Sequence, residues 1–132
     1  MENKIVVHTK DGGIHKGVTH DFDPNETGFH LLPAEGGGVP MRFQMDQLKA
    51  LFYVKDYIGN RDFVAQMSFD AERRERRKAI ARFEDGEEIW GFVDAGAEKE
   101  GNGFFFHPAD QRDNNIRIFV VRSALKELRL VS

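Results

Sequence analysis

The chain has 132 residues, with 19 Lys and Arg against 22 Asp and Glu, and it contains no cysteine. This composition excludes disulfide bonds and thiolate metal sites, and no apolar run approaches the roughly 20 residues of a membrane-spanning helix. Because Met1-Glu2-Asn3-Lys4 is not typical of a signal peptide, we expect a cytoplasmic protein with no membrane partner, built from one small domain or two very small ones.

An internal repeat organises the chain, because residues 4–54 and 78–131 carry matching residues in the same order. The offset between matches is 74 residues at first and grows to 75 and then 77, only across predicted loops, where insertions are tolerated. The matches are Asp11-Gly12 with Asp85-Gly86, Gly17 with Gly91, Gly28-Phe29 with Gly103-Phe104, Pro33-Ala34 with Pro108-Ala109, Val39, Met41 and Phe43 with Ile116, Ile118 and Val120, and Leu48-Lys49, Leu51 and Val54 with Leu125-Lys126, Leu128 and Val131. We infer a tandem duplication.

The first copy predicts five short strands separated by turns. Asp11-Gly12-Gly13 favours a hairpin, since Asp-Gly readily adopts the positive φ of such turns. Asp23-Pro24-Asn25-Glu26 predicts a second turn, and a single helical turn capped by Asp46 is expected before the last strand. The expected strands are 4–9, 14–22, 28–32, 39–45 and 49–54.

The second copy repeats this order, with a helical turn at Arg122–Leu125. Its expected strands are 78–84, 88–94, 103–107, 115–121 and 126–131. Five short antiparallel strands with one helical turn describe a small SH3-like or Sm-like barrel. We therefore predict an all-β protein of two tandem five-stranded barrels, residues 1–60 and 78–132, joined at 61–77 by a charged linker or short helix. The alternative is one larger β-barrel or sandwich shared by both halves, PilZ-like.

Several blocks of the first half form the pattern DG-KG-DFxP-FHL-LKAxFxVKD-GN; they are Asp11-Gly12, Lys16-Gly17, Asp21-Phe22-Asp23-Pro24, Phe29-His30-Leu31, residues 48–56 and Gly59-Asn60. In these blocks residues 4–66 resemble an uncharacterised bacterial family, a domain of unknown function. The resemblance implies a bacterial protein but no activity, substrate or catalytic residue. The second copy has Trp90-Gly91 in place of Lys16-Gly17 and lacks the DFxP block, so we expect any function of the signature in the first copy alone.

The Asp21-Phe22-Asp23-Pro24 block has two interpretations. As a structural corner, Asp23 accepts a backbone N–H two residues later and Pro24 fixes φ. As a binding site, Asp21 and Asp23 form a rim beside Lys16 and His30. Two nearby carboxylates do not by themselves indicate acid–base catalysis, which needs a cleft and shifted pKa values.

The run Arg73-Arg74-Glu75-Arg76-Arg77-Lys78 is the most concentrated charge in the chain. As a site it predicts nucleotide binding by Arg73, Arg74 and Arg77, and the spacing of Arg73 and Arg77 resembles the paired arginines before the barrel of PilZ domains, which bind cyclic di-GMP. The chain departs from that family at residues 94–99, which lack the serine and spaced glycine of the D/N-x-S-x-x-G block. The plainer interpretation is a solvated linker with weak ion pairs.

RNA binding follows only from the Sm-like topology, and fold analogy is a weak argument for function. Residues 1–66 hold 7 basic and 9 acidic residues and residues 67–132 hold 12 and 13, so neither half is basic. This balance argues against a nucleic-acid partner.

A metal-dependent site is a further alternative, with His8, His15 and His20 as weak candidates near Asp21. No pair among them has the tight spacing of known zinc motifs, and no nucleophile motif is present. The expectation is therefore no metal, no cofactor and no enzymatic activity.

The partner prediction follows from size, because copies of about 50 residues are marginal alone. Phe105 and Phe119 lie in runs that place apolar side chains on both faces of their strands. We expect the copies to pack on each other or the protein to form a homo-oligomer, with Phe105 and Phe119 at the interface. The leading function is a non-enzymatic, regulatory protein- or ligand-binding module of unknown specificity.

Overall fold

The computed structural model describes residues 3–35, 38–58, 76–94, 101–110 and 113–131. In these residues the protein is all-β, as predicted, and the linker prediction for 61–77 lies almost wholly outside them. The strands are β1 (Lys4–Thr9), β2 (Ile14–Val18), β3 (Gly28–Pro33), β4 (Met41–Gln44), β5 (Leu48–Val54), β6 (Arg76–Phe83), β7 (Glu88–Asp94), β8 (Gly103–Pro108), β9 (Asn115–Val121) and β10 (Leu125–Val131), with 3₁₀ turns η1 (Met45–Gln47) and η2 (Arg122–Ala124).

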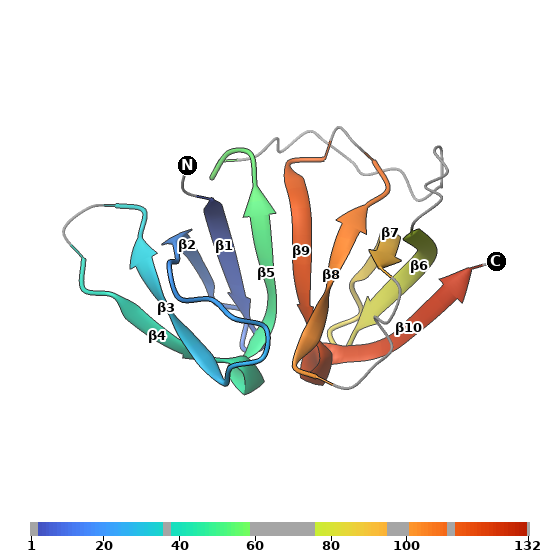
Figure 1. The fold of residues 1–132 in the computed structure, drawn as a ribbon, viewed down its shortest axis with the longest axis horizontal. Coiled ribbons are helices and arrows are strands. Elements are labelled where there is room, and N and C mark those ends of the chain that lie inside the picture. Colours follow the sequence, from blue (N-terminus) through green and yellow to red (C-terminus); the bar gives the residue numbers. More distant parts are fainter. Residues whose placement is uncertain (1–2, 36–37, 59–75, 95–100, 111–112, 132) are drawn as a thin grey trace.

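The ten strands form one continuous antiparallel sheet in the order β10-β6-β7-β8-β9-β5-β1-β2-β3-β4. The two copies therefore share a sheet, joined where β5 of the first copy pairs with β9 of the second. Figure 1 shows β5 and β9 side by side at the centre, with β4 and β10 at opposite ends. A single sheet shared by both copies is closer to the alternative prediction, one structure shared by both halves, than to two separate barrels.

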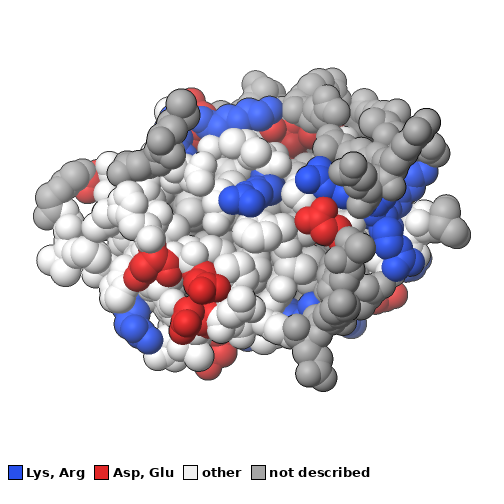
Figure 2. Space-filling view, in the orientation of Figure 1, with Lys and Arg blue, Asp and Glu red and all other residues white. Residues whose placement is uncertain are grey.

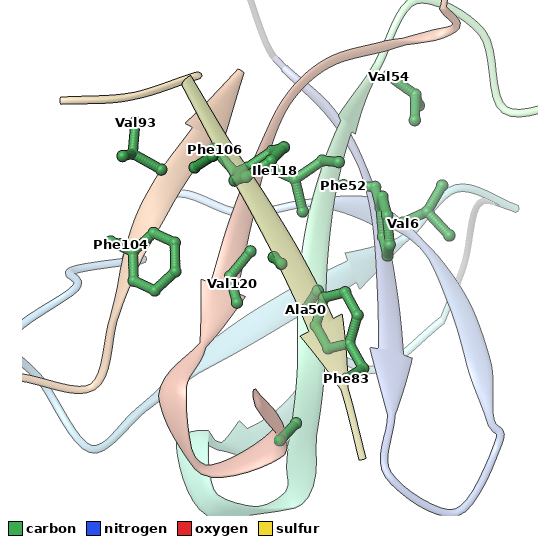
Figure 3. Close-up of a cluster of buried hydrophobic side chains, with 13 residues drawn as sticks. Val6, Ala50, Phe52, Val54, Phe83, Val93, Phe104, Phe106, Ile118 and Val120 are labelled. Atoms are coloured by element: carbon green, nitrogen blue, oxygen red, sulfur yellow. The ribbon is translucent and has the colours of Figure 1, made fainter. Parts of the chain in front are cut away.

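Each strand at this junction contributes to two hydrophobic cores, because side chains alternate between the faces of a strand. Ala50 and Phe52 of β5 belong to the cluster that also contains Phe83, Phe106 and Ile118 of the second copy, and Figure 3 shows them among those side chains. Conversely, Phe119 and Val121 of β9 belong to the first-copy cluster with Ile5, Phe29 and Leu51. The cores are thus interlocked across the junction.

The local turns follow from the sequence. Gly12 and Gly86 occupy equivalent hairpins with φ of 93° and 95°, a conformation that glycine adopts without strain. The helical turn before β5 is a 3₁₀ turn whose N-cap is Gln44 rather than the predicted Asp46, because the Gln44 and Gln47 side chains form a capping box.

Strand β2 ends at Val18, four residues before the predicted end. The segment that follows packs across the junction, because Phe22 makes edge contacts with Phe29 and with Phe119 of the second copy. The Asn102 amide donates hydrogen bonds to the carbonyls of Pro24 (2.9 Å) and Glu26 (2.7 Å). The DFxP block therefore fastens one copy to the other.

Lys49 of β5 forms the ion pairs that join the copies at the hairpin end. Its Nζ lies 2.7 Å from Asp85 Oδ2 and 2.5 Å from Glu87 Oε1, and its side chain is 12% exposed. The hydrogen bond from Lys49, helped by the Glu87 backbone N–H, lowers the pKa of Asp85. Burial alone would lower the pKa of Lys49, but its hydrogen bonds and charge interactions with Asp85 and Glu87 raise it.

Replacing Lys49 by Met is expected to lower the free energy of unfolding by about 1 kcal/mol at neutral pH, because the two carboxylates are half-exposed. A carboxylate whose pKa is depressed by folding stabilises the protein above the pKa of the unfolded chain and loses that effect as pH falls through the folded value. The difference between wild type and variant should shrink below about pH 4. Urea titrations from pH 3 to pH 7 measure it, and a pH-independent difference would contradict this role.

Candidate ligand-binding groove

A groove opens in the first copy where β2 and β3 diverge. Their ladder joins only Gly17 to Pro33 and Val18 to Leu32, after which the rest of β3 pairs with β4. Residues Ile14 to Lys16 of β2 pair with β1 on one side and border the groove on the other.

This space, which we name the β2 groove, has a volume of about 640 Å³ and is lined by Ile14, His15, Lys16, Leu31, Pro33, Ala34, Glu35, Met41, Tyr57 and Ile58. Its volume lies in the range of about 300–1,000 Å³ typical of ligand sites. Ile14, Met41 and Ile58 are 57%, 40% and 76% exposed, which places three of the large exposed apolar side chains of the described chain here. Lys16, also exposed, contributes a cation.

Tyr57 and Ile58 reach the β2 groove because the segment after β5 is fixed in place. The Tyr57 hydroxyl donates to the Gly17 carbonyl at 3.0 Å. Asp56 accepts the Ile58 N–H at 3.1 Å, and the Asn114 amide donates to the Asp56 carbonyl at 2.9 Å. Tyr57 and Ile58, which directly follow the VKD part of the signature, therefore border the groove.

The second copy places different chemistry at the equivalent positions. Glu88, Ile89 and Trp90 stand where the first copy has Ile14, His15 and Lys16. The Trp90 indole N–H donates to Glu88 at 2.9 Å, Arg82 bonds the same carboxylate, and Ile89 packs against the core. These side chains are engaged with one another, which makes the first copy the better candidate for binding.

The structure gives Asp21 and Asp23 structural contacts. Asp21 accepts the His30 backbone N–H at 2.9 Å, and its other carboxylate oxygen lies 2.7 Å from His30 Nδ1; these two bonds, the backbone one first, lower the pKa of Asp21. Asp23 accepts the Asn25 N–H at 2.9 Å. The pair Asp21–His30 holds the β2–β3 segment on β3, and neither residue lines the β2 groove, whereas Lys16 does.

The candidate histidines are not brought together. His8 pairs with Ile14 and His15 with Val7, so His8 and His15 lie on opposite faces of the β1–β2 hairpin. The His8 ring contacts Phe52 and the His15 ring contacts Phe43, both tilted, with centroids 4.5 Å and 5.1 Å apart. His20 follows β2 in the exposed β2–β3 segment. Within the residues described, no three His, Asp or Glu side chains form a group suited to a metal ion.

The basic run is only partly within the described residues, since Arg73 and Arg74 lie outside them. Arg76 bonds Asp94 at 3.0 Å, and Arg77 is an exposed residue of β6. On the face shown in Figure 2, basic groups gather mainly over the second copy and the upper edge, and acidic groups lie over the lower part of the first. Acidic groups lie beside some of the basic ones, so the basic groups do not form one continuous stripe on that face.

The two predicted interface residues lie at the junction between the copies. Phe119 is fully buried, and Phe105 is half-buried against Tyr53 and Phe119, with the Arg117 guanidinium 4.4 Å from its ring. The outer apolar face expected from the sequence is thus covered by the other copy.

Of the residues that line the β2 groove, Lys16 and His15 are candidates from the sequence, His15 for a metal, whereas Ile14, Met41, Tyr57 and Ile58 are not. Ile14 and Met41 lie in expected strands whose two faces the sequence does not distinguish, and residues 55–58 follow the last expected strand within the predicted first barrel, residues 1–60. Residues 14–16 differ in chemical type from the equivalent residues 88–90 of the second copy, and this difference could have indicated the groove.

None of the described helical segments has the length and apolar character required to cross a membrane. Comparison with protein families finds that residues 1–132 match the model of a family of unknown function, DUF6982. This match covers both copies, whereas the resemblance seen in the sequence covered about residues 4–66. Comparisons with curated proteins and with solved structures find no match.

Proposed function

We propose that this chain, which belongs to the DUF6982 family of unknown function, is a non-enzymatic binding module whose β2 groove holds an extended segment of a partner protein. The observation that carries the proposal is the concentration of exposed Ile14, Met41 and Ile58 around one open space of about 640 Å³. Exposed apolar groups gathered in a concave site are typical of interaction surfaces.

The composition of the groove specifies the chemistry of the segment. Leu31 and Pro33 form part of an apolar lining suited to a branched or aromatic side chain. The Lys16 cation favours an acidic residue next to that side chain in the bound segment. The Glu35 carboxylate, which lines the same groove, disfavours a second acidic residue in the segment.

A peptide suits the site better than a compact small molecule because strand edges border the groove. The ladder between β2 and β3 covers only two residue pairs, so the rest of β2 borders the groove instead of pairing with β3. An extended segment can hydrogen-bond to strand edges while its alternate side chains enter the apolar space. The proposal retains the cytoplasmic, regulatory setting expected from the sequence.

A displayed library of random 12-residue peptides, selected on the wild-type protein, tests this function. We expect enriched peptides to carry an apolar residue next to an acidic one. Their affinity should fall at least about fivefold, the effect of roughly 1 kcal/mol, when Lys16 is replaced by Glu, and fall further when Ile14 is replaced by Asp.

Lys126→Glu is the matched control, because Lys126 is an exposed lysine of β10, which lies at the other end of the sheet. This variant should bind the selected peptides as wild type does. Selection without enrichment, or enriched peptides whose affinity ignores Lys16→Glu and Ile14→Asp, would show that the groove is not a peptide site.

A further inference from the structure

The two free edge strands of the sheet, β4 and β10, are the repeat equivalents of β9 and β5, the two strands that pair at its centre. With the 77-residue offset of the repeat, β4 corresponds to β9 and β10 corresponds to β5. The sheet order is therefore one copy's β5-β1-β2-β3-β4 series followed by the other's. A head-to-tail interface of this type can be repeated between chains to give rings or filaments, unless something prevents it.

The junction depends on side chains that enter the core of the other copy. Ala50 pairs with Val120 and Phe52 with Ile118 on one face, and Leu51 pairs with Phe119 on the other. The residues that cross are Ala50, Phe52 and Val54 of β5 and Phe119 and Val121 of β9, and all five are buried.

At the free edges four of these five positions are polar, and Val131 keeps the apolar character of Val54. Arg42 and Gln44 of β4 stand where β9 has Phe119 and Val121, and Glu127 and Arg129 of β10 stand where β5 has Ala50 and Phe52. All four edge residues are exposed. The remaining edge positions stay apolar, with Met41 in place of Ile118 and Leu128 in place of Leu51. The polar replacements thus fall on four of the five crossing positions.

We propose that four polar edge residues prevent the β5–β9 type of pairing from forming between chains, so that β4 and β10 do not pair with a further copy. These residues are Arg42, Gln44, Glu127 and Arg129. Pairing β4 with β10 of another chain would direct Arg42 into one core and Glu127 and Arg129 into the other, without the partners that a buried charge requires. Charged side chains directed inward are a known protection of edge strands. Pro40, which precedes the short β4, removes one more backbone donor from that edge.

Restoring the junction residues one edge at a time tests the proposal. One variant carries Arg42→Phe and Gln44→Val, and the other carries Glu127→Ala and Arg129→Phe. Each retains one rejecting edge and should be monomeric by analytical ultracentrifugation, as should wild type. A mixture of the two should form a 1:1 heterodimer, with association at least about 100-fold tighter than for either variant alone. Circular dichroism verifies that each variant is folded.

Two results would overturn the proposal. One is a mixture of folded variants that stays monomeric. The other is trapping of the wild-type edges, tested with Arg42→Cys on one chain and Leu128→Cys on another, the equivalents of the paired Phe119 and Leu51. Because the chain has no native cysteine, a disulfide between the two different variants would report β4–β10 pairing, and each variant oxidised alone is the control for links between like chains. Neither result depends on whether the β2 groove binds a peptide.

Discussion

Replacing Phe119 by Asp is expected to unfold the protein. The Phe119 ring is fully buried and contacts Phe22 at 5.0 Å and Phe105 at 5.2 Å between ring centroids. Removing a buried Phe side chain costs about 3–5 kcal/mol, and an unpaired carboxylate in its place adds a further penalty. The sum is comparable to the roughly 5–15 kcal/mol that stabilises a folded domain. Loss of the cooperative urea transition and of the β-sheet circular dichroism signal would show it.

Phe119→Ala and Ile116→Ala make the measurement quantitative. The alanine variant at 119 should fold with a free energy of unfolding lower by about 3–5 kcal/mol. Ile116 lies on the same strand and is 57% exposed, so its replacement should change stability by less than about 0.5 kcal/mol. A folded, dissociated Phe119→Asp protein would instead place Phe119 between chains.

Replacing Gly17 by Ala is expected to separate β2 from β3 and to disturb the β2 groove. A Cβ at Gly17 would lie 2.0 Å from the Leu32 carbonyl oxygen, which is backbone and cannot move without breaking the ladder. Such overpacking costs about 3 kcal/mol. Urea titration should show this loss, together with weaker binding of peptides selected on wild type.

Gly91→Ala is the matched control for the groove. Gly91 is the equivalent glycine, and a Cβ there would lie 2.1 Å from the His107 carbonyl oxygen. We expect a similar loss of stability, with peptide affinity unchanged in the folded fraction. Equal weakening of peptide binding by both changes would mean that the affinity loss reflects stability and not the groove.

Most strand boundaries were predictable because each copy carries its own turn residues. The predicted ranges 4–9, 88–94 and 115–121 agree with β1, β7 and β9. The predicted range 14–22 is too long for β2, which ends at Val18. Its end is determined by tertiary contacts, namely those of Phe22 with Phe119 and of Asn102 with the Pro24 carbonyl, and these involve residues of the other copy.

The residues of the candidate site were less predictable than the strands, because their positions around one groove depend on tertiary structure. Exposed Ile14 and Met41 look like ordinary strand residues in the sequence, and only the divergence of β2 from β3 places them around one space. Asp21 and His30 looked like binding residues because they are polar and close to Lys16, yet their hydrogen bonds are to each other. Chemical type was visible in the sequence, but the direction of each side chain was not.

The pairing of β5 with β9 also governs how the protein folds. It brings residue 50 to residue 120, so the centre of the sheet consists of contacts between distant parts of the chain. High contact order of this kind slows folding. During synthesis the first copy emerges with Leu51 and Tyr53 lacking the Phe119 and Val121 that complete their core. The core of the first copy therefore cannot be completed until Phe119 and Val121, close to the end of the sequence, have been synthesised.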